Sequence, residues 1–459
     1  MASSDQTRYI CSSAMSLPLQ VNVGLVVDDV LDASILRDKY AQFVKLWPLL
    51  GGKLLSKFDM RRFQCGSRVD FEERTIKKDL AWFLPFSWHP GATPRIIFDD
   101  LDSVDEKFLF AAPSNSTSTS KLRVTNLNDA TLLCFSFSHS LCDGQSVYDI
   151  IRYFCDLLSD KPIPTFALPP DSTGKRMSNL IRKAMTEPLP AQPEQDIFVT
   201  NPLTALKFQI KYLILRVAES LRLSPKLTHR LVYLPGIWVD DIRSRAQKEL
   251  DDSGEHLGMQ LTRNDLIAAL YLKIVYGAKR MTNDPVDYTG PINYRALLEP
   301  SEPDTYYIHN SITFLLCQFS EREIQTESIT RIAVRLRLAT IRYHHPTSIK
   351  REITRFEDKV LAPIMQNSRG GVKWGISMYN PWTSFKYTSL DFSGASRQGR
   401  KPTVVFVNPS VPLVLGRLPS PFAINQKDGA GGYWLRAANT QRGWEAFERL
   451  TSMDSLFRS

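Results

Sequence analysis

Residues 137–144 read Phe137-Ser138-His139-Ser140-Leu141-Cys142-Asp143-Gly144, and they join two patterns of different period. Upstream, residues 131–138 alternate between large apolar and smaller side chains, which is the two-residue period of a β-strand. Downstream, the apolar residues recur at helical spacing, as Val147, Ile150, Ile151, Phe154, Leu157 and Leu158 do. The stretch predicts a strand, a tight turn and a helix. Strand and helix signals alternate along the rest of the chain too, so we expect a mixed α/β protein with large sheets.

His139 lies where the predicted strand ends, on a turn that the flanking elements hold in place. A neutral imidazole takes a proton from a hydroxyl group near physiological pH, so His139 is a candidate general base. Asp143 follows four residues later, and Gly144 gives the backbone freedom to bend sharply. His-x-x-x-Asp also occurs by chance in many proteins, so on spacing alone a surface or capping role stays open. A metal site is not expected, because no third ligand lies nearby.

The length, composition and charge of the chain limit which kind of protein it can be. A chain of 459 residues is too long for one ordinary core, so we expect two domains. Its 43% hydrophobic and 23% charged residues are typical of a soluble globular protein. The net charge of +9 suits an anionic partner, but the charges are dispersed and no nucleic-acid-binding motif is present. We therefore expect no nucleic-acid partner, and a phosphorylated cofactor or a well-solvated surface each accounts for the charge.

The cysteines and the apolar runs of the sequence indicate where in the cell the protein is expected. The six cysteines are scattered, which favours reduced thiols and a cytoplasmic location. Residues 1–20 lack a long apolar core after basic residues, so no secretory signal is expected, and no run reaches the length of a membrane span. Residues 203–223 are amphipathic and basic. They fit contact with a membrane surface, although their interspersed charges favour an ordinary surface helix.

Several further elements are predicted from local signals. Residues 34–47 have the spacing of a helix that ends at Pro48, and residues 160–202 are rich in proline and polar residues, as a linker or long crossover would be. Residues 231–235 predict a strand that opens the second half, with a helix from about Asp240. The other predictions are a polar loop at 113–120, a capped helix start at Thr262 and Asp265, a strand through 312–316, a helix from Ser328 to about Tyr343, and a hairpin turn at 428–432.

Short motifs follow one another in a fixed order along most of the chain. After His139-x-x-x-Asp143-Gly144 come Leu261-Thr-Arg-Asn-Asp-Leu-Ile-Ala-Ala-Leu, Asn293-Tyr-Arg295, Tyr307-Ile-His-Asn310 and Asp391-Phe392-Ser393-Gly394. Before it stands Trp47-Pro-Leu-Leu-Gly-Gly-Lys-Leu. Together they resemble the BAHD family of coenzyme A-dependent acyltransferases, particularly its fungal secondary-metabolite O-acetyltransferases.

The resemblance implies two similar chloramphenicol-acetyltransferase-like domains, each a mixed sheet flanked by helices, that meet along a solvent channel. We place the first domain at residues 1–200, a crossover at 201–230 and the second domain at 231–459. We expect a monomer without stable membrane insertion.

The resemblance also implies roles for site residues. His139 would be the general base in the middle of the channel, and Asp143 would point away from the substrates and pair with an arginine, for which Arg295 is the candidate. Gly144 belongs to the same motif, and Asp391 of the second motif would be structural. The co-substrate would be acyl-coenzyme A, with acetyl-coenzyme A as the expected donor, and the resemblance implies no permanently bound cofactor and no metal.

The second motif departs from the family pattern Asp-Phe-Gly-Trp-Gly. Asp391 and Phe392 are retained, but Ser393, Gly394 and Ala395 replace the last three residues. We therefore expect this loop to pack differently from the family pattern, without an effect on the base. Related carrier-protein-dependent condensation enzymes have a second histidine where this chain has Ser138, and that difference disfavours the carrier-protein branch.

Three basic residues follow the second motif. Arg397, Arg400 and Lys401 are predicted to bind the phosphates of coenzyme A, and the alternative is that they are solvated loop charges. The predicted reaction is acyl transfer to a hydroxyl of a small secondary metabolite in a ternary complex. The alternatives are an amide-forming or carrier-protein-dependent acyltransferase, or a binding protein without catalytic activity.

Overall fold

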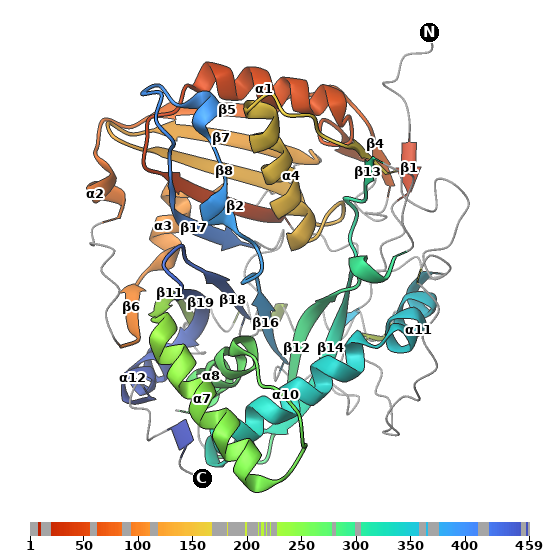
Figure 1. Cartoon of the computed structure of the whole chain (residues 1–459), viewed down its shortest axis with the longest axis vertical. Helices are drawn as coiled ribbons and strands as arrows, with labels where there is room; N and C mark the ends of the chain where they lie inside the picture. Colours follow the sequence, from red (N-terminus) through yellow and green to blue (C-terminus); the bar gives the residue numbers. More distant parts are fainter. Residues whose placement is uncertain are drawn as a thin grey trace.

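The chain forms two large β-sheets, one above the other in Figure 1, with helices packed against each of them. The computed structural model describes residues 8–10, 20–55, 62–84, 93–110, 118–167, 181, 198–199, 210, 213–214, 217, 221, 227–277, 281–298, 304–357, 364–365, 376–411, 422–450 and 456–457. Both sheets combine parallel and antiparallel pairs. The predicted mixed α/β class with two mixed sheets is therefore confirmed.

The first sheet contains the strand that leads to His139. Its order is β17-β2-β8-β7-β5, and only the β5–β7 pair is parallel. Because β8 lies at the centre of the sheet, its residues are buried on both faces, and only its last residue is half-exposed. The strands are β17 (Val404–Ser410), β2 (Gln20–Val27), β8 (Thr131–Ser138), β7 (Ser120–Asn126) and β5 (Phe71–Thr75).

Two helices cover one face of this sheet. In α4 (Gly144–Leu158), the Phe154 ring meets the ring of Tyr40 from α1 (Ala33–Leu46) and the ring of Phe135 from β8. Burial of such side chains contributes about 1.5–3 kcal/mol each. This packing fixes α4 against β8, and it thereby fixes the turn between them.

The second sheet has the order β14-β12-β16-β18-β19-β11-β6. Its central helix α8 (Arg263–Tyr276) is buried on every side from Asp265 to Tyr276, as expected for a helix inside a core. The strands are β14 (Ile312–Ser320), β12 (Pro285–Asn293), β16 (Ile376–Pro381), β18 (Phe422–Lys427), β19 (Tyr433–Thr440), β11 (Leu227–Leu234) and β6 (Arg95–Phe98), and the other helices are α7 (Gly236–Ser253), α9 (Glu321–Thr326), α10 (Ile329–His344), α11 (Pro346–Glu357) and α12 (Gln441–Leu450).

Two strands cross between the halves of the chain. The orange β6 comes from the N-terminal half but pairs with the green β11 in the second sheet. The blue β17 comes from the C-terminal half but pairs with the red β2 in the first sheet (Figure 1). Each sheet thus incorporates one strand from beyond the expected division between residues 200 and 231.

Short elements complete the described structure. A parallel pair of two-residue strands, β9 (Thr165–Phe166) and β13 (Thr305–Tyr306), ties the first half to the second. The remaining elements are α2 (Leu80–Phe83), α3 (Leu101–Phe108), the strands β1 (Arg8–Ile10), β3 (Lys53–Leu54), β4 (Arg62–Gln64), β10 (Phe198–Val199) and β15 (Ile364–Met365), and the 3₁₀ turns η3 (Arg295–Leu297), η4 (Tyr387–Ser389) and η5 (Ser393–Ala395).

Most locally predicted elements are confirmed. Thr262 and Asp265 form a complete capping box, and the hairpin turn joins β18 to β19. The helix expected from about Asp240 begins earlier, at Gly236, because Pro235 with its φ of −59° occupies the N-cap. Most of the predicted loop at 113–120, crossover at 160–202 and amphipathic segment at 203–223 lies outside the described residues.

Candidate active site

His139 lies on the turn between β8 and α4, as the sequence predicted. Its side chain is 9% exposed, and Nδ1 is buried. Nε2 is therefore the ring nitrogen left to meet a substrate. Burial lowers the pKa of the imidazole, while the negative charge of Asp143 and the amide of Asn310 act in the opposite direction. The net pKa lies below the ordinary value, so at neutral pH the ring is uncharged and can accept a proton.

Asp143 does not face the substrate side of the turn, because its two oxygens are occupied by protein donors. Oδ1 caps α4 by accepting a hydrogen bond of 3.0 Å from the backbone amide of Ser146. Oδ2 accepts a hydrogen bond of 2.7 Å from the backbone amide of Ser311 and lies 3.1 Å from Nη2 of Arg295. The predicted ion pair between Asp143 and Arg295 is thus present.

The ion pair is buried and strongly coupled. Asp143 is 1% and Arg295 15% exposed at the side chain. Burial alone would raise the pKa of the Asp143 carboxyl, but the charge of Arg295 and the amides of Ser146 and Ser311 outweigh it and hold the pKa below its ordinary value. Arg295 also donates to the carbonyls of Tyr307 (3.1 Å) and His309 (2.8 Å). The guanidinium therefore links the start of α4 to residues 307–309.

Asn310 is a site residue to which the sequence assigned no role. Its Nδ2 donates a hydrogen bond of 2.7 Å to the backbone carbonyl of His139. Asn310 and Ser311 are both 1% exposed or less, so these contacts are shielded from water. The motif Tyr307-Ile-His-Asn310 was the available signal, but only the folded chain shows what its asparagine binds.

Gly144 is the first residue of α4, directly after the turn, and its φ is not positive. A Cβ atom at this position would lie 3.0 Å from the ring of Trp382. The missing side chain therefore makes room for Trp382 over the start of α4.

Asp391 lies in the loop at the other end of α4. Its Oδ1 accepts a hydrogen bond from the hydroxyl of Ser393 and one of 2.9 Å from the amide of that residue. The Ser393 hydroxyl is the main cause of a lowered pKa at Asp391. A Cβ atom on Gly394 would lie 2.0 Å from the carbonyl oxygen of Leu158, the last residue of α4. A side chain at position 394 would therefore collide with the end of α4.

The three predicted phosphate-binding residues lie in the same region. Arg397 is 3.9 Å from Asp32, and Arg400 is 3.9 Å from Asp28 and 3.8 Å from Asp29. Lys401 is exposed and lowers the pKa of Asp391. The 15 residues of α4 separate this loop from Asp143 by about 22 Å, at about 1.5 Å per residue. The structure does not bring these three residues to the turn that carries His139.

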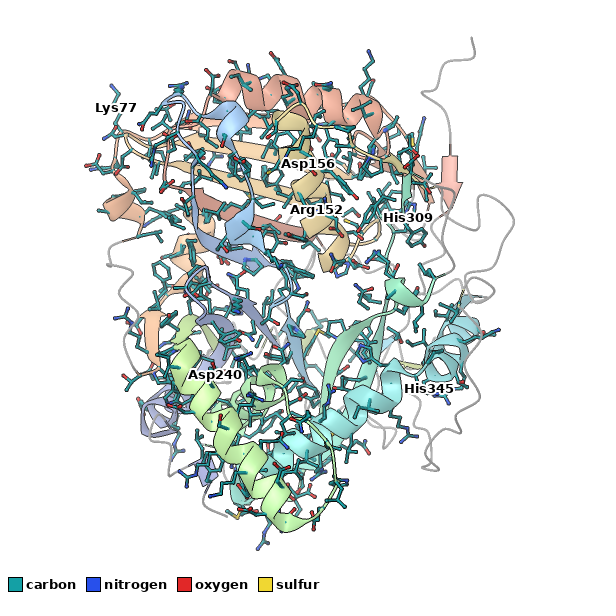
Figure 2. All side chains as sticks on the ribbon, viewed as in Figure 1. Lys77, Arg152, Asp156, Asp240, His309 and His345 are labelled. Atoms are coloured by element: carbon teal, nitrogen blue, oxygen red, sulfur yellow. The ribbon has the colours of Figure 1, made fainter. Side chains whose placement is uncertain are left out.

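Two other histidines differ in their distance from the turn, and His345 is the distant one. His345 is at the start of α11, in the lower part of the molecule in Figure 2, whereas Arg152 and Asp156 mark α4 in the upper part. His309 is buried near the site, and burial lowers its pKa to about 4. Within the described ranges, no three His, Cys, Asp or Glu side chains gather as metal ligands do.

A basic cavity lies beside the start of α8. It has a volume of about 470 Å³. Three basic side chains line it: Arg243, Arg263 and Lys427. Arg263 also forms an ion pair with Asp240. The cavity also contacts Thr383, which follows Trp382 in the chain. Trp382 in turn packs over Gly144 at the start of α4, next to the turn that carries His139.

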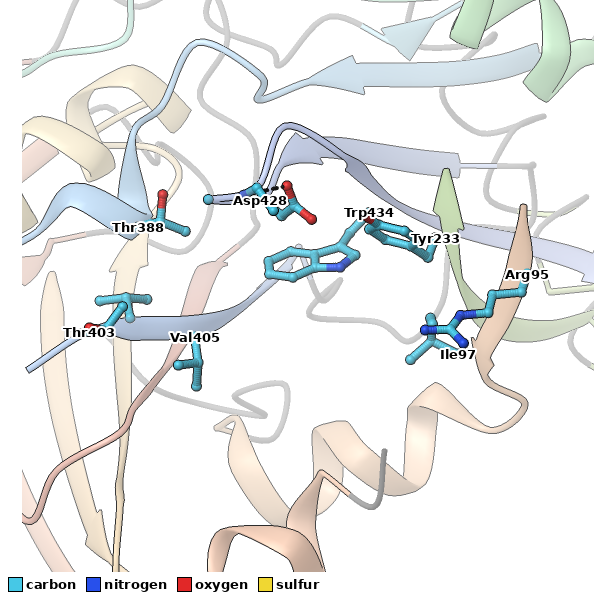
Figure 3. A pocket seen from close by; sticks show the side chains of 11 residues that line it. Arg95, Ile97, Tyr233, Thr388, Thr403, Val405, Asp428 and Trp434 are labelled. Carbon is cyan, nitrogen blue, oxygen red and sulfur yellow. Dashed lines mark hydrogen bonds between the residues drawn. The ribbon is translucent and has the colours of Figure 1, made fainter. Parts of the chain in front are cut away.

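A second cavity, of about 230 Å³, lies between β17 and β6 (Figure 3). Trp434, Tyr233 and Val405 form much of its lining, with Arg95 at the right in Figure 3 and Asp428 above the Trp434 ring. Val404, at the edge of this cavity, pairs with Val27 of β2, and Val27 pairs on its other side with Thr131, the first residue of β8. His139 follows the last residue of β8, about 26 Å away at about 3.3 Å per residue. This cavity is therefore separate from the catalytic turn.

Comparisons with known proteins agree with this arrangement. A family model described as "Transferase family" matches residues 102–411. Acetyltransferase peniE of Penicillium patulum is 35% identical over 95% of this chain and 96% of its own length. A protein of Penicillium decumbens named transcriptional regulator calD is 24% identical over 92% of this chain and 90% of its own length.

The fold also matches a solved structure. TRI101 of F. graminearum, crystallised with coenzyme A and T-2 mycotoxin, superposes with a TM-score of 0.71 at 11% identity, over 98% of this chain and 99% of that one. At 11% identity this structural likeness shows only the fold. The family is shown by the family model and by the peniE relative. The chain belongs to the Transferase family, the BAHD family of coenzyme A-dependent acyltransferases.

Proposed function

We propose that the chain is an O-acyltransferase that moves an acetyl group from acetyl-coenzyme A to a hydroxyl of a secondary metabolite. The observation that carries this proposal is a nearly buried His139 whose lowered pKa keeps the imidazole uncharged at neutral pH. The name of the peniE relative supports acetyl as the acyl group.

In the proposed mechanism, Nε2 of His139 removes the proton of the acceptor hydroxyl. The oxygen attacks the thioester carbonyl and forms a tetrahedral oxyanion, which collapses and expels the coenzyme A thiolate. The protonated imidazole then returns its proton to the thiolate sulfur. General-base catalysis of this kind is worth about 10²–10⁴-fold in rate. Holding both substrates in one site adds at best about 7–11 kcal/mol through proximity.

Asp143, Arg295 and Asn310 act as positioning residues in this mechanism. Asp143 caps α4 and binds Arg295, while Asn310 holds the carbonyl of His139 itself. Neither carboxylate oxygen of Asp143 is left for a substrate proton, since both accept from the protein. The work of these residues is to keep the imidazole in one orientation.

For the coenzyme A phosphates we propose the basic cavity at the start of α8. Arg243, Arg263 and Lys427 supply three positive charges against the single charge of Asp240. Nε of Arg243 is buried without a hydrogen-bond partner among the described residues, so it is available to an anion. The loop of Arg397, Arg400 and Lys401 stays an alternative prediction, although its two arginines already face aspartates.

We further propose that the enzyme works as a monomer in the cytoplasm. Cys134, Cys155 and Cys317 are buried free thiols, which suits a reducing compartment. No helix in the described part of the chain is long and apolar enough to cross a membrane. Light scattering after size exclusion tests the monomer, and a value of twice the chain mass would contradict it.

The function is tested by incubating the protein with acetyl-coenzyme A and hydroxylated terpenoids, polyketides and alkaloids. Thiol release and mass spectrometry of the products report acyl transfer. The expected result is an ester product that depends on His139. Matched amines and carrier-bound donors form the second arm of the screen. Transfer only to amines would replace O-acylation by amide formation, transfer only from a carrier would exclude coenzyme A, and tight acceptor binding without transfer would indicate a binding protein.

A further inference from the structure

The turn that follows β16 contacts both the wall of the basic cavity and the start of α4. We call residues 382–385 the bridging turn. The carbonyl of Trp382 accepts a hydrogen bond of 3.1 Å from the amide of Phe385, which closes the turn. In Figure 1, β16 lies between α8 below it and α4 above it. The side chains of the bridging turn reach these two helices on opposite sides, as the contacts below show.

On the cavity side, hydrogen bonds tie the bridging turn to α8. Nδ2 of Asn264, the second residue of α8, donates a hydrogen bond of 2.9 Å to Oγ1 of Thr383. The Thr383 hydroxyl in turn lies 3.2 Å from Oδ1 of Asn264, and a hydroxyl can accept and donate at once. Both side chains are half-buried, and both line the basic cavity. The pair is therefore part of the cavity wall.

On the other side, two aromatic rings of the bridging turn pack against α4. The Phe385 ring stacks on that of Tyr148, with centroids 5.6 Å apart and planes inclined by 8°. Trp382 lies so close to Gly144 that a Cβ atom there would be 3.0 Å from its indole ring. Gly144 directly follows Asp143, the N-cap of α4, and Tyr148 lies about one helical turn further on. The bridging turn thus packs on the part of α4 that Asp143 caps.

We infer that the Asn264–Thr383 pair couples an anion in the basic cavity to the catalytic turn. A phosphate held by Arg243 and Lys427 orders the cavity wall, and once one wall is ordered, less entropy is lost in ordering what packs against it. The rings of the bridging turn carry this order to the start of α4, because a close-packed interior transmits a displacement. Asn264 and Thr383 are positioning residues, since neither touches the reacting atoms in the proposed mechanism. The inference rests on the proposed function, which makes this cavity the phosphate site.

A donor split into two molecules tests the coupling. Acetyl-pantetheine carries the thioester without the phosphates of coenzyme A, and 3′,5′-ADP supplies phosphates separately. In the parent, 3′,5′-ADP should raise kcat for transfer from acetyl-pantetheine about 3–10-fold, the usual worth of one hydrogen bond. Asn264→Ala and Thr383→Val should lose this stimulation, and each should lower kcat with acetyl-coenzyme A by a similar factor. Thr383→Ser retains the hydroxyl and should keep the stimulation.

Hydrogen exchange measures the same coupling without catalysis. Binding of 3′,5′-ADP should slow amide exchange over residues 139–148 in the parent, but not in Asn264→Ala. The matched control is Asn128→Ala, which removes a side-chain hydrogen bond of 2.8 Å to Asp79 in the loop before β8. This control should respond to 3′,5′-ADP as the parent does. No effect of 3′,5′-ADP on the parent, or an equal effect in Asn264→Ala, would overturn the inference.

The same experiments separate this inference from the proposed function. A parent that transfers acetyl from neither donor would refute the acyl transfer, and the exchange measurement would still decide whether the cavity is coupled to the turn. Thermal unfolding distinguishes a loss of coupling from a loss of fold. Lost stimulation at a parental melting temperature, restored in Thr383→Ser, supports the coupling. Stimulation that Thr383→Val retains would contradict it.

Discussion

The side-chain amide of Asn310 donates a hydrogen bond of 2.7 Å to the backbone carbonyl of His139, 171 positions earlier in the chain. Arg295 reaches Asp143 in the same way across 152 positions. The turn that carries the base is therefore built by the first half of the chain and held by the second. The orientation of the imidazole therefore depends on how the two halves dock.

Replacement of His139 by alanine should abolish acyl transfer and leave the fold intact. Asn310 holds the turn through the backbone carbonyl of His139, and this hydrogen bond does not need the imidazole. We expect a loss of about 10²–10⁴-fold in kcat/KM, the usual worth of a general base. Thiol release measures the activity and circular dichroism the fold. A folded variant with near-parental activity would remove His139 from the mechanism.

Asp143→Asn should lower activity and stability together. The substitution leaves the Arg295 charge buried without its counter-charge, which costs about 3–5 kcal/mol in a buried pair. Thermal unfolding measures the loss. The matched control is Glu73→Gln, which breaks an exposed pair with Arg37 and should cost at most about 1 kcal/mol. Equal melting temperatures for Asp143→Asn and the parent would show that the pair contributes nothing.

The pH profile of kcat/KM should report the lowered pKa of His139. Since the base must be neutral, activity falls as pH decreases through that pKa, which burial places below the ordinary value of 6.5. The Asp143 charge raises this pKa, so its removal in Asp143→Asn should move the acid limb of the residual activity to still lower pH. An acid limb above the ordinary histidine range would indicate that another group titrates.

Two double variants distinguish the two candidate phosphate sites. Arg243→Ala/Lys427→Ala should raise the KM for acetyl-coenzyme A with little change in kcat, as expected when uniform binding is lost. The sequence-based prediction assigns that effect to Arg397→Ala/Arg400→Ala instead. Initial rates at low and high salt measure both, because the contribution of exposed charges shrinks as salt increases. An unchanged KM in either variant removes its residues from the cofactor site.

Gly394→Ala should destabilise the fold although it adds one methyl group. That methyl would lie 2.0 Å from the carbonyl oxygen of Leu158, so α4 or the loop must shift. Overpacking of this kind costs about 1–3 kcal/mol, and thermal unfolding detects it. Gly429→Ala is the control, because the nearest atom to its Cβ would be 3.6 Å away. A parental melting temperature for Gly394→Ala would mean that the loop accommodates a side chain.

The sequence by itself determined the features that depend on neighbouring residues. The alternation at 131–138 and the helical spacing after Gly144 predicted β8 and α4, and Thr262 with Asp265 predicted the capping box of α8. The order of the motifs identified the family and led to the Asp143–Arg295 pair, which the structure contains. Periodicity and capping act over a few positions, so they are legible without the fold.

Only the tertiary structure decided which distant residues meet. It showed that β6 and β17 exchange between the sheets, that Asn310 holds His139, and that Gly144 makes room for Trp382. It also placed Arg397 and Arg400 beside aspartates at the far end of α4. These relationships arise from the docking of two halves whose contacts span more than 150 positions. No local pattern encodes them, because the same short sequence can pair with any surface that completes its hydrogen bonds and buries its apolar face.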